Sequence, residues 1–268
     1  MSQEEFREKY KLDKNAEIRA SRKRDGRILN VTEGRGVTYS SYKDWVNEGY
    51  VNPVEDQGYC GSCWAFASVG VLESLEAITY GKNYLKVYSK QQAISCDTYN
   101  SGCEGGFPVD SWIWLADSYY ERGMEMCSSS SYPYTESDSV CKFDTYCSQK
   151  YSTAIPTMVE VGVENKDEVL LSMTYVNPVA VAINADALQF YESGIFSDTS
   201  CSNDVNHAVI NVGYGASNGV EYWKVRNSWG TSWGENGYIR MRRYGNPSSG
   251  PYNGICGILS DINNVYII

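Results

Sequence analysis

The strongest pattern in the chain is a helical one that begins at Cys63. Apolar side chains recur there at steps of three and four residues, at Trp64, Ala67, Val71, Leu75 and Ile78. This spacing places them on one face of an amphipathic helix, and Gly81 is a suitable end for it. The pattern predicts a helix from about Cys63 to Gly81, with the cysteine at its N-terminus.

The two halves of the chain differ in their hydrophobic period. Residues from about 61 to 125 mainly predict helices, one of them over 111–120. From about 150 onward, short alternating or apolar runs predict strands, at 179–183, 207–215, 221–226 and 238–241. Helices followed by strands indicate an α+β fold or two subdomains. We expect a helical part over roughly 50–150 and a β part over roughly 151–268.

The composition is that of a globular protein with an acidic body. The 268 residues are 42% hydrophobic, enough to bury a sizeable core as one large domain or two small ones. No run approaches 18 apolar residues, which argues against a membrane span. The net charge is −10, with +3 over residues 1–36 and −13 over the remainder. An acidic body argues against nucleic-acid binding.

Cys63 is the first candidate for chemistry. At a helix N-terminus, unpaired N–H groups and the macrodipole favour negative charge, so we expect a lowered thiol pKa and a nucleophilic thiolate. Gln57 lies six residues upstream. We expect its side-chain amide to donate to a developing oxyanion together with the Cys63 backbone N–H. The alternative is a buried structural cysteine at the start of a helix.

His207 is the only histidine in the chain, and it opens the alternating strand predicted over 207–215. Asn227 follows the next predicted strand. Its carbonyl can accept from one imidazole N–H and aim the other nitrogen at the thiol, and Trp229 can cover that bond from water. The alternatives are a structural histidine and, for Asn227 to Gly230, an ordinary turn.

Taken together, these motifs resemble the papain family (cathepsin L-like) of clan CA cysteine proteases. Residues 57–66 contain the family's C-G-S-C-W signature, and His207 follows Cys63 at the family's spacing, 144 residues later. The resemblance runs from about Tyr39 to the C-terminus. Further blocks that carry it lie at 102–106, 131–134 and 256–258. It implies a papain-like two-lobed fold, with a helical left lobe, an antiparallel β-barrel-like right lobe and the active-site cleft between them.

The resemblance also implies an activity and partners. The expected enzyme is an endopeptidase in which a Cys63 thiolate pairs with a His207 imidazolium, Asn227 orients the histidine and Gln57 contributes to the oxyanion hole. Expected partners are protein and peptide substrates, the chain's own propeptide and cystatin-like inhibitors. No cofactor, metal, nucleic acid or membrane is expected, and we expect a monomer. The alternatives are a catalytically silent binding or storage protein, a transpeptidase and an exopeptidase. Family members that remove dipeptides use an inserted loop with a further histidine. The only histidine of this chain is His207, which favours the endopeptidase.

For substrate binding, the resemblance implies residues that no pattern in the sequence marks. Gly105 and Gly106 are expected to line the cleft and pair with substrate backbone, although paired glycines also form simple tight turns. Asp261 is expected at the floor of the S2 pocket, which implies a P2 preference for apolar or aromatic residues and also for Arg or Lys. The alternative is an exposed acid near the terminus. Trp229 belongs to the expected substrate-binding set, and the S2 walls are expected at Phe107, Pro108, Ala182, Val205 and Asn206.

The chain has nine cysteines, an odd number that leaves one without a disulfide partner. A zinc site is not indicated, because Cys60 and Cys63 form the only C-x2-C pair and no histidine cluster accompanies it. The resemblance implies that Cys63 stays unpaired. It implies the bridges Cys60–Cys103, Cys96–Cys141 and Cys201–Cys256, and leaves Cys127 and Cys147 for a fourth. Disulfides indicate an oxidising compartment, so we expect the lysosome or vacuole, or the extracellular space.

Residues 1–36 differ in composition from the rest of the chain. They form either a solvated, flexible terminus or a remnant of an inhibitory propeptide, because residues 3–10 are similar to the C-terminal part of the family's prodomain. We expect the peptidase domain over 37–268 and the start of the mature enzyme between about Gly34 and Ser40. The positive segment would be attracted to the acidic body.

Overall fold

The computed structural model describes residues 28–31, 39–123, 125–151, 156–161, 166–245 and 250–267. Segments 3–10 and 34–38 lie outside the described residues. The expected propeptide similarity and most of the expected start of the mature enzyme fall on these segments. Among the helices of the described ranges, none combines the length and the apolar character needed to cross a membrane.

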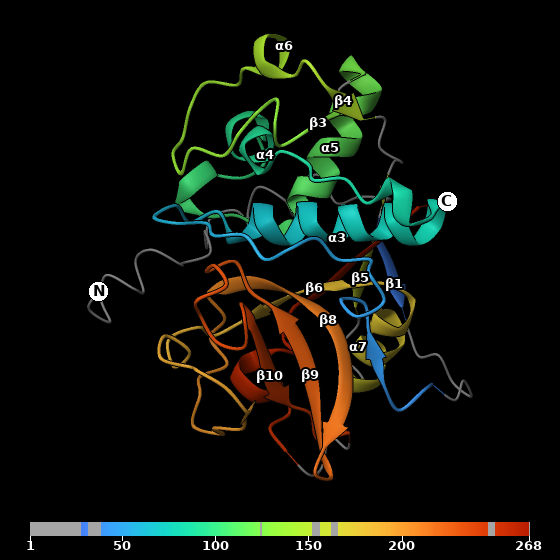
Figure 1. The fold of residues 1–268 in the computed structure, drawn as a ribbon, viewed down its shortest axis with the longest axis vertical. Coiled ribbons are helices and arrows are strands. Elements are labelled where there is room, and N and C mark those ends of the chain that lie inside the picture. Colours follow the sequence, from blue (N-terminus) through green and yellow to red (C-terminus); the bar gives the residue numbers. More distant parts are fainter. Residues whose placement is uncertain are drawn as a thin grey trace.

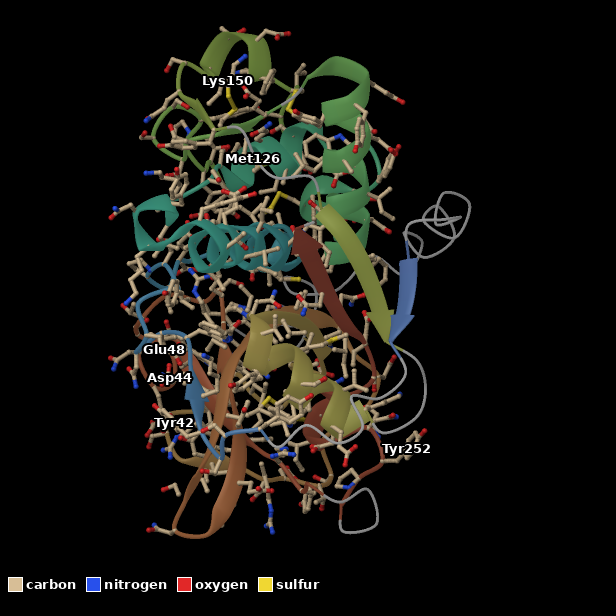
Figure 2. The ribbon with its side chains drawn as sticks, turned by 90° about the vertical axis from the view of Figure 1, so that its right-hand side faces the viewer. Tyr42, Asp44, Glu48, Met126, Lys150 and Tyr252 are labelled. Carbon is tan, nitrogen blue, oxygen red and sulfur yellow. A yellow bond between two sulfur atoms is a disulfide. The ribbon has the colours of Figure 1, made fainter. Side chains whose placement is uncertain are left out.

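One half of the molecule is a helical lobe built around the long helix α3, Cys63–Tyr80. The other elements of this lobe are α4 Lys90–Cys96, α5 Pro108–Arg122, α6 Phe143–Tyr146, and 3-10 turns at Lys82–Tyr84 and Gly102–Glu104. Two short strands, β3 Met126–Cys127 and β4 Lys150–Tyr151, pair antiparallel. Figure 1 shows α4, α5 and α6 on one side of α3 and the sheet lobe on the other. Figure 2 places Met126 and Lys150 on the helical side, away from the sheet lobe.

The other half is dominated by one large sheet, in the order β1-β5-β11-β6-β8-β9-β10-β7, with β2 paired to β8. Its strands are β1 Ile28–Val31, β2 Lys43–Asp44, β5 Pro156–Val161, β6 Val179–Ile183, β7 Ile195–Phe196, β8 His207–Ser217, β9 Val220–Arg226, β10 Tyr238–Arg242 and β11 Ile262–Ile267. Neighbouring strands run antiparallel, except that β1 is parallel to β5 and β7 is parallel to β10. The predicted α+β fold with a helical and a sheet lobe is confirmed.

Helix α7, Lys166–Val176, was not predicted, because the pattern after residue 150 indicated strands alone. Two acids, Asp167 and Glu168, occupy its first turn, and Val169, Leu170 and Met173 are buried. Acidic residues at a helix N-terminus are favoured by the macrodipole. Leu170 and Val169 lie three and four positions before Met173, a spacing that places all three on one helical face. The signal was therefore present, but it is short.

Helix α3 has the predicted bounds but not the predicted amphipathic character. Residues 63–77 are all buried, including Glu73 and Glu76. The cause is its place in the fold, since α3 contacts α4 and α5 on one side and β6, β8 and β11 on the other. A helix covered on all sides has no solvent-facing stripe.

An apolar cluster joins the two lobes, and we call it the interface cluster. It combines one face of α3 with side chains of α5, β6, β8 and β11: Cys63, Ala67, Val71, Leu75, Val109, Trp112, Ile113, Ala180, Ala182, Ala208, Ile210, Val212 and Val265. Gly70 permits the close approach of α3 to β8, because a Cβ atom there would lie 2.7 Å from Cδ1 of Ile210. The first residue of α3 is therefore fixed at the junction of the lobes.

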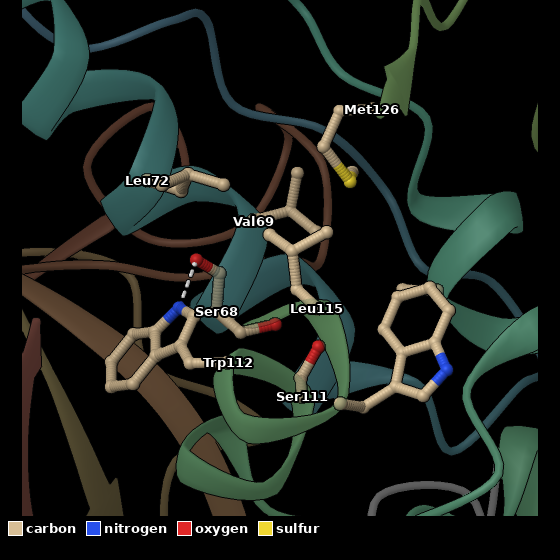
Figure 3. Close-up of a pocket in the computed structure, with 9 residues that line it drawn as sticks. Ser68, Val69, Leu72, Ser111, Trp112, Leu115 and Met126 are labelled. Atoms are coloured by element: carbon tan, nitrogen blue, oxygen red, sulfur yellow. Dashed lines mark hydrogen bonds between the residues drawn. The ribbon is translucent and has the colours of Figure 1, made fainter. Parts of the chain in front are cut away.

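A small cavity lies inside the helical lobe, between α3 and α5 (Figure 3). Its volume of about 10 Å³ is that of a single water-sized probe. Side chains such as Leu72, Leu115 and Met126 line it. It is a packing void and has no room for a substrate group.

Candidate active site

Cys63 is the first residue of α3 and lies fully buried at the junction of the lobes. Its Sγ accepts a hydrogen bond from the backbone N–H of Ala208 at 3.5 Å. Ala208 directly follows His207 on β8, so the thiol of the helical lobe lies beside the histidine of the sheet lobe. The N-terminus of α3 and the start of strand β8 meet at this sulfur.

The pKa of the thiol departs from the expectation drawn from the helix N-terminus. Burial raises the pKa of Cys63 to about 11, although the backbone N–H groups of Ala208, Trp64 and Cys63 itself act to lower it. Removing a charged group from water outweighs three hydrogen bonds here. The prediction of a lowered thiol pKa is therefore wrong for this buried arrangement.

His207 is held by Asn227, which follows β9. The ring Nε2 and the Asn227 Oδ1 are 2.8 Å apart, and the backbone N–H of Ser228 donates to the same Oδ1 at 2.8 Å. Because the Ser228 N–H donates to it, this atom is the amide oxygen, which can only accept. Nε2 therefore carries the proton, and in the neutral ring Nδ1 is the basic nitrogen.

The imidazole is covered by an aromatic side chain. Trp229 stacks on His207 with the ring centroids 4.7 Å apart and an interplanar angle of 26°, and Trp233 meets Trp229 edge-on at 5.1 Å. His207 is fully buried. This burial lowers the pKa of His207 to about 4, while the bond to Asn227 acts to raise it.

Gln57 is fixed at both ends of its amide. Its Oε1 accepts from Ser228 Oγ at 2.6 Å, and its Nε2 donates to the Cys60 carbonyl at 2.9 Å. These two bonds orient the amide. Its nitrogen carries two hydrogens, so one N–H bonds to the Cys60 carbonyl and the second remains to donate elsewhere. The sequence motifs assigned no role to Ser228 or to Tyr134. The hydroxyl of Tyr134 donates to the Gln57 backbone carbonyl at 2.5 Å.

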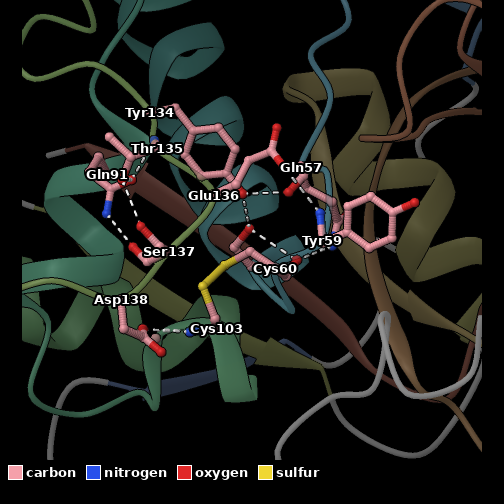
Figure 4. The surroundings of a disulfide bond; sticks show 12 residues. Gln57, Tyr59, Cys60, Gln91, Cys103, Tyr134, Thr135, Glu136, Ser137 and Asp138 are labelled. Carbon is pink, nitrogen blue, oxygen red and sulfur yellow. Dashed lines mark hydrogen bonds between the residues drawn. A yellow bond between two sulfur atoms is a disulfide. The ribbon is translucent and has the colours of Figure 1, made fainter. Parts of the chain in front are cut away.

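The loop before α3 is tied to the loop 102–107 (Figure 4). The bridge Cys60–Cys103 joins them, and the Gly61 N–H donates to the Cys103 carbonyl at 2.9 Å. Asp138 accepts from the Cys103 N–H at 2.8 Å. These contacts hold Gly105 and Gly106 in a fixed position relative to the helix that carries Cys63.

Comparison with known proteins decides the family of this chain. A family model described as "Papain family cysteine protease" matches residues 39–265. The chain belongs to the papain family.

Similar sequences and structures agree with this assignment. Pro-cathepsin H of Medicago truncatula is 37% identical over 89% of this chain and 65% of its own length. Cysteine proteinase RD21A of Arabidopsis thaliana is 37% identical over 96% of this chain and 52% of its own length. The chain thus spans between about half and two thirds of these relatives.

Solved structures of the papain family match on both lobes. The bromelain protease from Ananas comosus in complex with E64 gives a TM-score of 0.75 at 33% identity, over 86% of this chain and all of that chain. Digestive procathepsin L 3 from Tenebrio molitor larval midgut gives 0.80 at 32% identity, over all of this chain and 80% of that chain.

The papain-family resemblance implied three disulfides and left Cys127 and Cys147 for a fourth, and the structure has all four bridges. They are Cys60–Cys103, Cys96–Cys141, Cys127–Cys147 and Cys201–Cys256. Cys63 is the one cysteine outside a bridge. In the described part of the chain, no group of His, Cys, Asp and Glu side chains is arranged to hold a metal ion.

The residues expected around S2 lie on four segments, three of which contribute to the interface cluster or pack against it. Phe107 and Val205 pack against the interface cluster that contains Cys63 and Ala182, and Pro108 begins α5. The Asp261 carbonyl accepts from the Ala182 N–H at 3.0 Å. The remaining wall residue, Asn206, precedes β8, and its amide contacts Ala185 and Asp186.

Proposed function

We propose that this protein is a cysteine endopeptidase that cleaves peptide bonds with Cys63 as nucleophile and His207 as acid and base. One observation carries the proposal: the Cys63 sulfur accepts the N–H that follows His207, while Asn227 holds the far nitrogen of that histidine. A thiol, a base and an orienting group are the parts that nucleophilic catalysis by cysteine requires.

The reaction proceeds by two acyl transfers. The thiol proton passes to His207, and the sulfur attacks the peptide carbonyl to form a tetrahedral oxyanion. The second N–H of Gln57 and the backbone N–H of Cys63 donate to that oxyanion. His207 then gives its proton to the leaving amine, which leaves a thioester on Cys63. His207 then deprotonates a water molecule that attacks the thioester. The bond from carbon to sulfur breaks, the carboxylic acid product leaves, and His207 returns the proton to the Cys63 thiolate.

The charged form of the pair has to arise as a unit. Burial works against the Cys63 thiolate and against the His207 imidazolium when each is considered alone. Transfer of the proton creates both charges together, and opposite charges attract more strongly in a buried site than in water. This attraction offsets part of the burial penalty, and access of water to the site would reduce the remainder.

Replacement of Gln57 by alanine is expected to lower kcat by about 10²–10³-fold, the usual effect of losing one oxyanion donor. Steady-state kinetics on a fluorogenic peptide measure this change. Ser228→Ala is the matched control, because it removes the 2.6 Å bond to Gln57 Oε1 but keeps the amide donor, so a smaller loss is expected. A Gln57→Ala enzyme with kcat within threefold of wild type would contradict the oxyanion role.

We propose that Asp261 gives the S2 pocket its tolerance for Arg or Lys at P2. The carboxylate is half-buried, and its Oδ1 accepts from Asn263 Nδ2 at 2.8 Å. The Asp261 carbonyl accepts from the Ala182 N–H, which holds the residue beside β6, where Ala182 is expected to form a wall of the pocket. A partly buried carboxylate is a suitable partner for a cationic side chain.

Asp261→Asn is expected to lower cleavage of an Arg-Arg substrate by about 10–100-fold, as for the loss of a charged hydrogen-bond partner. Cleavage of a Phe-Arg substrate should stay within about threefold. The asparagine keeps the size of the side chain and an acceptor for Asn263, so the ratio of kcat/KM values isolates the charge. An unchanged ratio, or a wild type that does not cleave Arg-Arg, would refute the role of Asp261.

The organisation of the chain and its setting follow from the same proposal. Residues 1–36 are a propeptide remnant and 37–268 the peptidase domain; the pairing of Ile28–Val31 with β5 gives the former a docking edge on the sheet. The four disulfides favour the lysosome or vacuole, or the extracellular space. The enzyme acts as a monomer on proteins and peptides, with cystatin-like proteins as inhibitors.

A further inference from the structure

A buried side chain, Asn100, supports the backbone at Gly106, which the papain-family resemblance leads us to expect in contact with substrate. The N–H of Phe107 donates to Oδ1 of Asn100 at 2.7 Å. A Cβ atom on Gly106 would lie only 2.2 Å from the same oxygen. Glycine at 106 therefore lets the backbone lie directly on the Asn100 amide, and the position of this segment depends on that amide.

The orientation of the Asn100 amide is set in turn by Asp97. Asn100 Nδ2 donates to Asp97 Oδ2 at 2.8 Å, and the backbone N–H groups of Tyr99 and Asn100 donate to Oδ1 at 2.7 and 3.2 Å. Because the amide nitrogen faces the carboxylate, the amide oxygen faces the Phe107 N–H. A reversed amide would place oxygen against carboxylate and N–H against N–H.

Asp97 is an expensive residue to keep in this place. It is 6% exposed, as is Asn100. Burial raises the pKa of Asp97 to about 7, against the hydrogen bonds from Asn100, Tyr99 and Ser111 that lower it. Closing the turn after α4 needs only the bonds to the two backbone N–H groups. The bond from Asn100 Nδ2 to Asp97 extends beyond the turn, because Asn100 in turn accepts from the N–H of Phe107, seven residues later.

We infer that Asp97 and Asn100 are positioning residues that fix the Gly106–Phe107 backbone for substrate binding. The inference rests on the proposed function and on the family-based expectation that Gly105 and Gly106 pair with substrate backbone. The relay ends at the Phe107 N–H and leaves the chemistry to Cys63 and His207. Its loss therefore weakens substrate binding and leaves the chemical step largely intact.

The test measures KM and kcat separately on one peptide substrate. Asp97→Asn brings two amide NH₂ groups face to face, and KM is expected to rise about tenfold, as for one lost buried hydrogen bond, with kcat within about twofold. Thr98→Ala is the control, because Thr98 is exposed in the same loop, and it should behave as wild type. Thermal unfolding of each variant verifies that it is folded at the assay temperature.

A double variant gives the decisive comparison. In Asp97→Asn/Asn100→Asp the new amide at 97 donates to the new carboxylate at 100, whose other oxygen accepts from the Phe107 N–H. The pairs among positions 97 and 100 and the Phe107 N–H are matched again, and the Ser111 hydroxyl can rotate to accept from the new amide. KM should therefore return to within about threefold of wild type. If the single variant does not fold, the double variant alone decides, since it is expected to fold and bind normally. A single variant with wild-type KM, or a double variant that does not recover, overturns the inference. A wild type without thiol-dependent activity would instead overturn the proposed function, and the inference with it.

Discussion

Replacement of Cys63 by alanine is expected to lower kcat/KM for peptide cleavage by at least about 10⁴-fold, because the bond to the acyl group forms on its sulfur. No other thiol can take over, since the remaining eight cysteines are in bridges. The fold should be unaffected, since alanine keeps the Cβ atom and favours the helix. Steady-state kinetics and thermal unfolding measure the two effects.

The matched control for Cys63→Ala lies at the other end of the same helix. The Thr79 hydroxyl donates to the Leu75 carbonyl one turn earlier in α3. Thr79→Ala should therefore keep activity within about threefold. If Cys63→Ala retained more than about a hundredth of the wild-type kcat/KM, the nucleophile would have to be another group.

Replacement of Lys90 by methionine is expected to lower the free energy of unfolding by about 3–5 kcal/mol, the usual cost of removing one partner of a buried ion pair. Lys90 Nζ lies 2.7 Å from Glu73 Oε1 and 2.7 Å from Glu55 Oε2, and the side chains of Lys90 and Glu73 are 2% and 1% exposed. Without the lysine, Glu73 would keep the donors Asn52 and Tyr88 but lose its compensating charge. Urea unfolding measures the change.

Glu55 also links the two lobes, because it pairs with Arg226 of the sheet lobe as well as with Lys90. Arg226, at the end of β9, lies 3.5 Å from Glu55 and donates to the Pro53 carbonyl at 2.5 Å. The double variant Lys90→Met/Glu73→Gln removes both buried charges and should recover part of the lost stability. The recovery is incomplete because one of the two oxygens that accept from Asn52 and Tyr88 becomes an NH₂ group. Glu48→Gln breaks an exposed pair with Lys43 and should cost less than about 1 kcal/mol. A Lys90→Met protein within 1 kcal/mol of wild type would mean that the buried pair adds little.

The sequence predicted the parts of the fold whose causes are local. The bounds of α3, β6 and β8 follow from runs of three-to-four or twofold periodicity, and the structure reproduces them. Helix α7 was missed because its apolar run is short. The all-round burial of α3 could not be predicted, because it depends on which elements cover the helix.

The candidate site shows the same division. The order and spacing of Cys63, His207 and Asn227 predicted the chemistry that we propose, and the roles of these residues stay predictions. The direction of the Cys63 pKa shift was wrong, since burial depends on the tertiary fold and outweighs the helix N-terminus. The relay from Asp97 to Phe107 and the ion pairs of Lys90 join residues by side-chain contacts that leave no periodic signal in the chain.

The central claim is that Cys63 is a nucleophile activated in place. Incubation with an epoxide or vinyl-sulfone peptide analogue at mildly acidic pH, followed by intact-mass and peptide mass spectrometry, tests it most directly. The wild-type protein should gain one adduct, located on Cys63, and Cys63→Ala should gain none. A wild-type protein that stays unlabelled, or an adduct that persists in Cys63→Ala, would contradict the account.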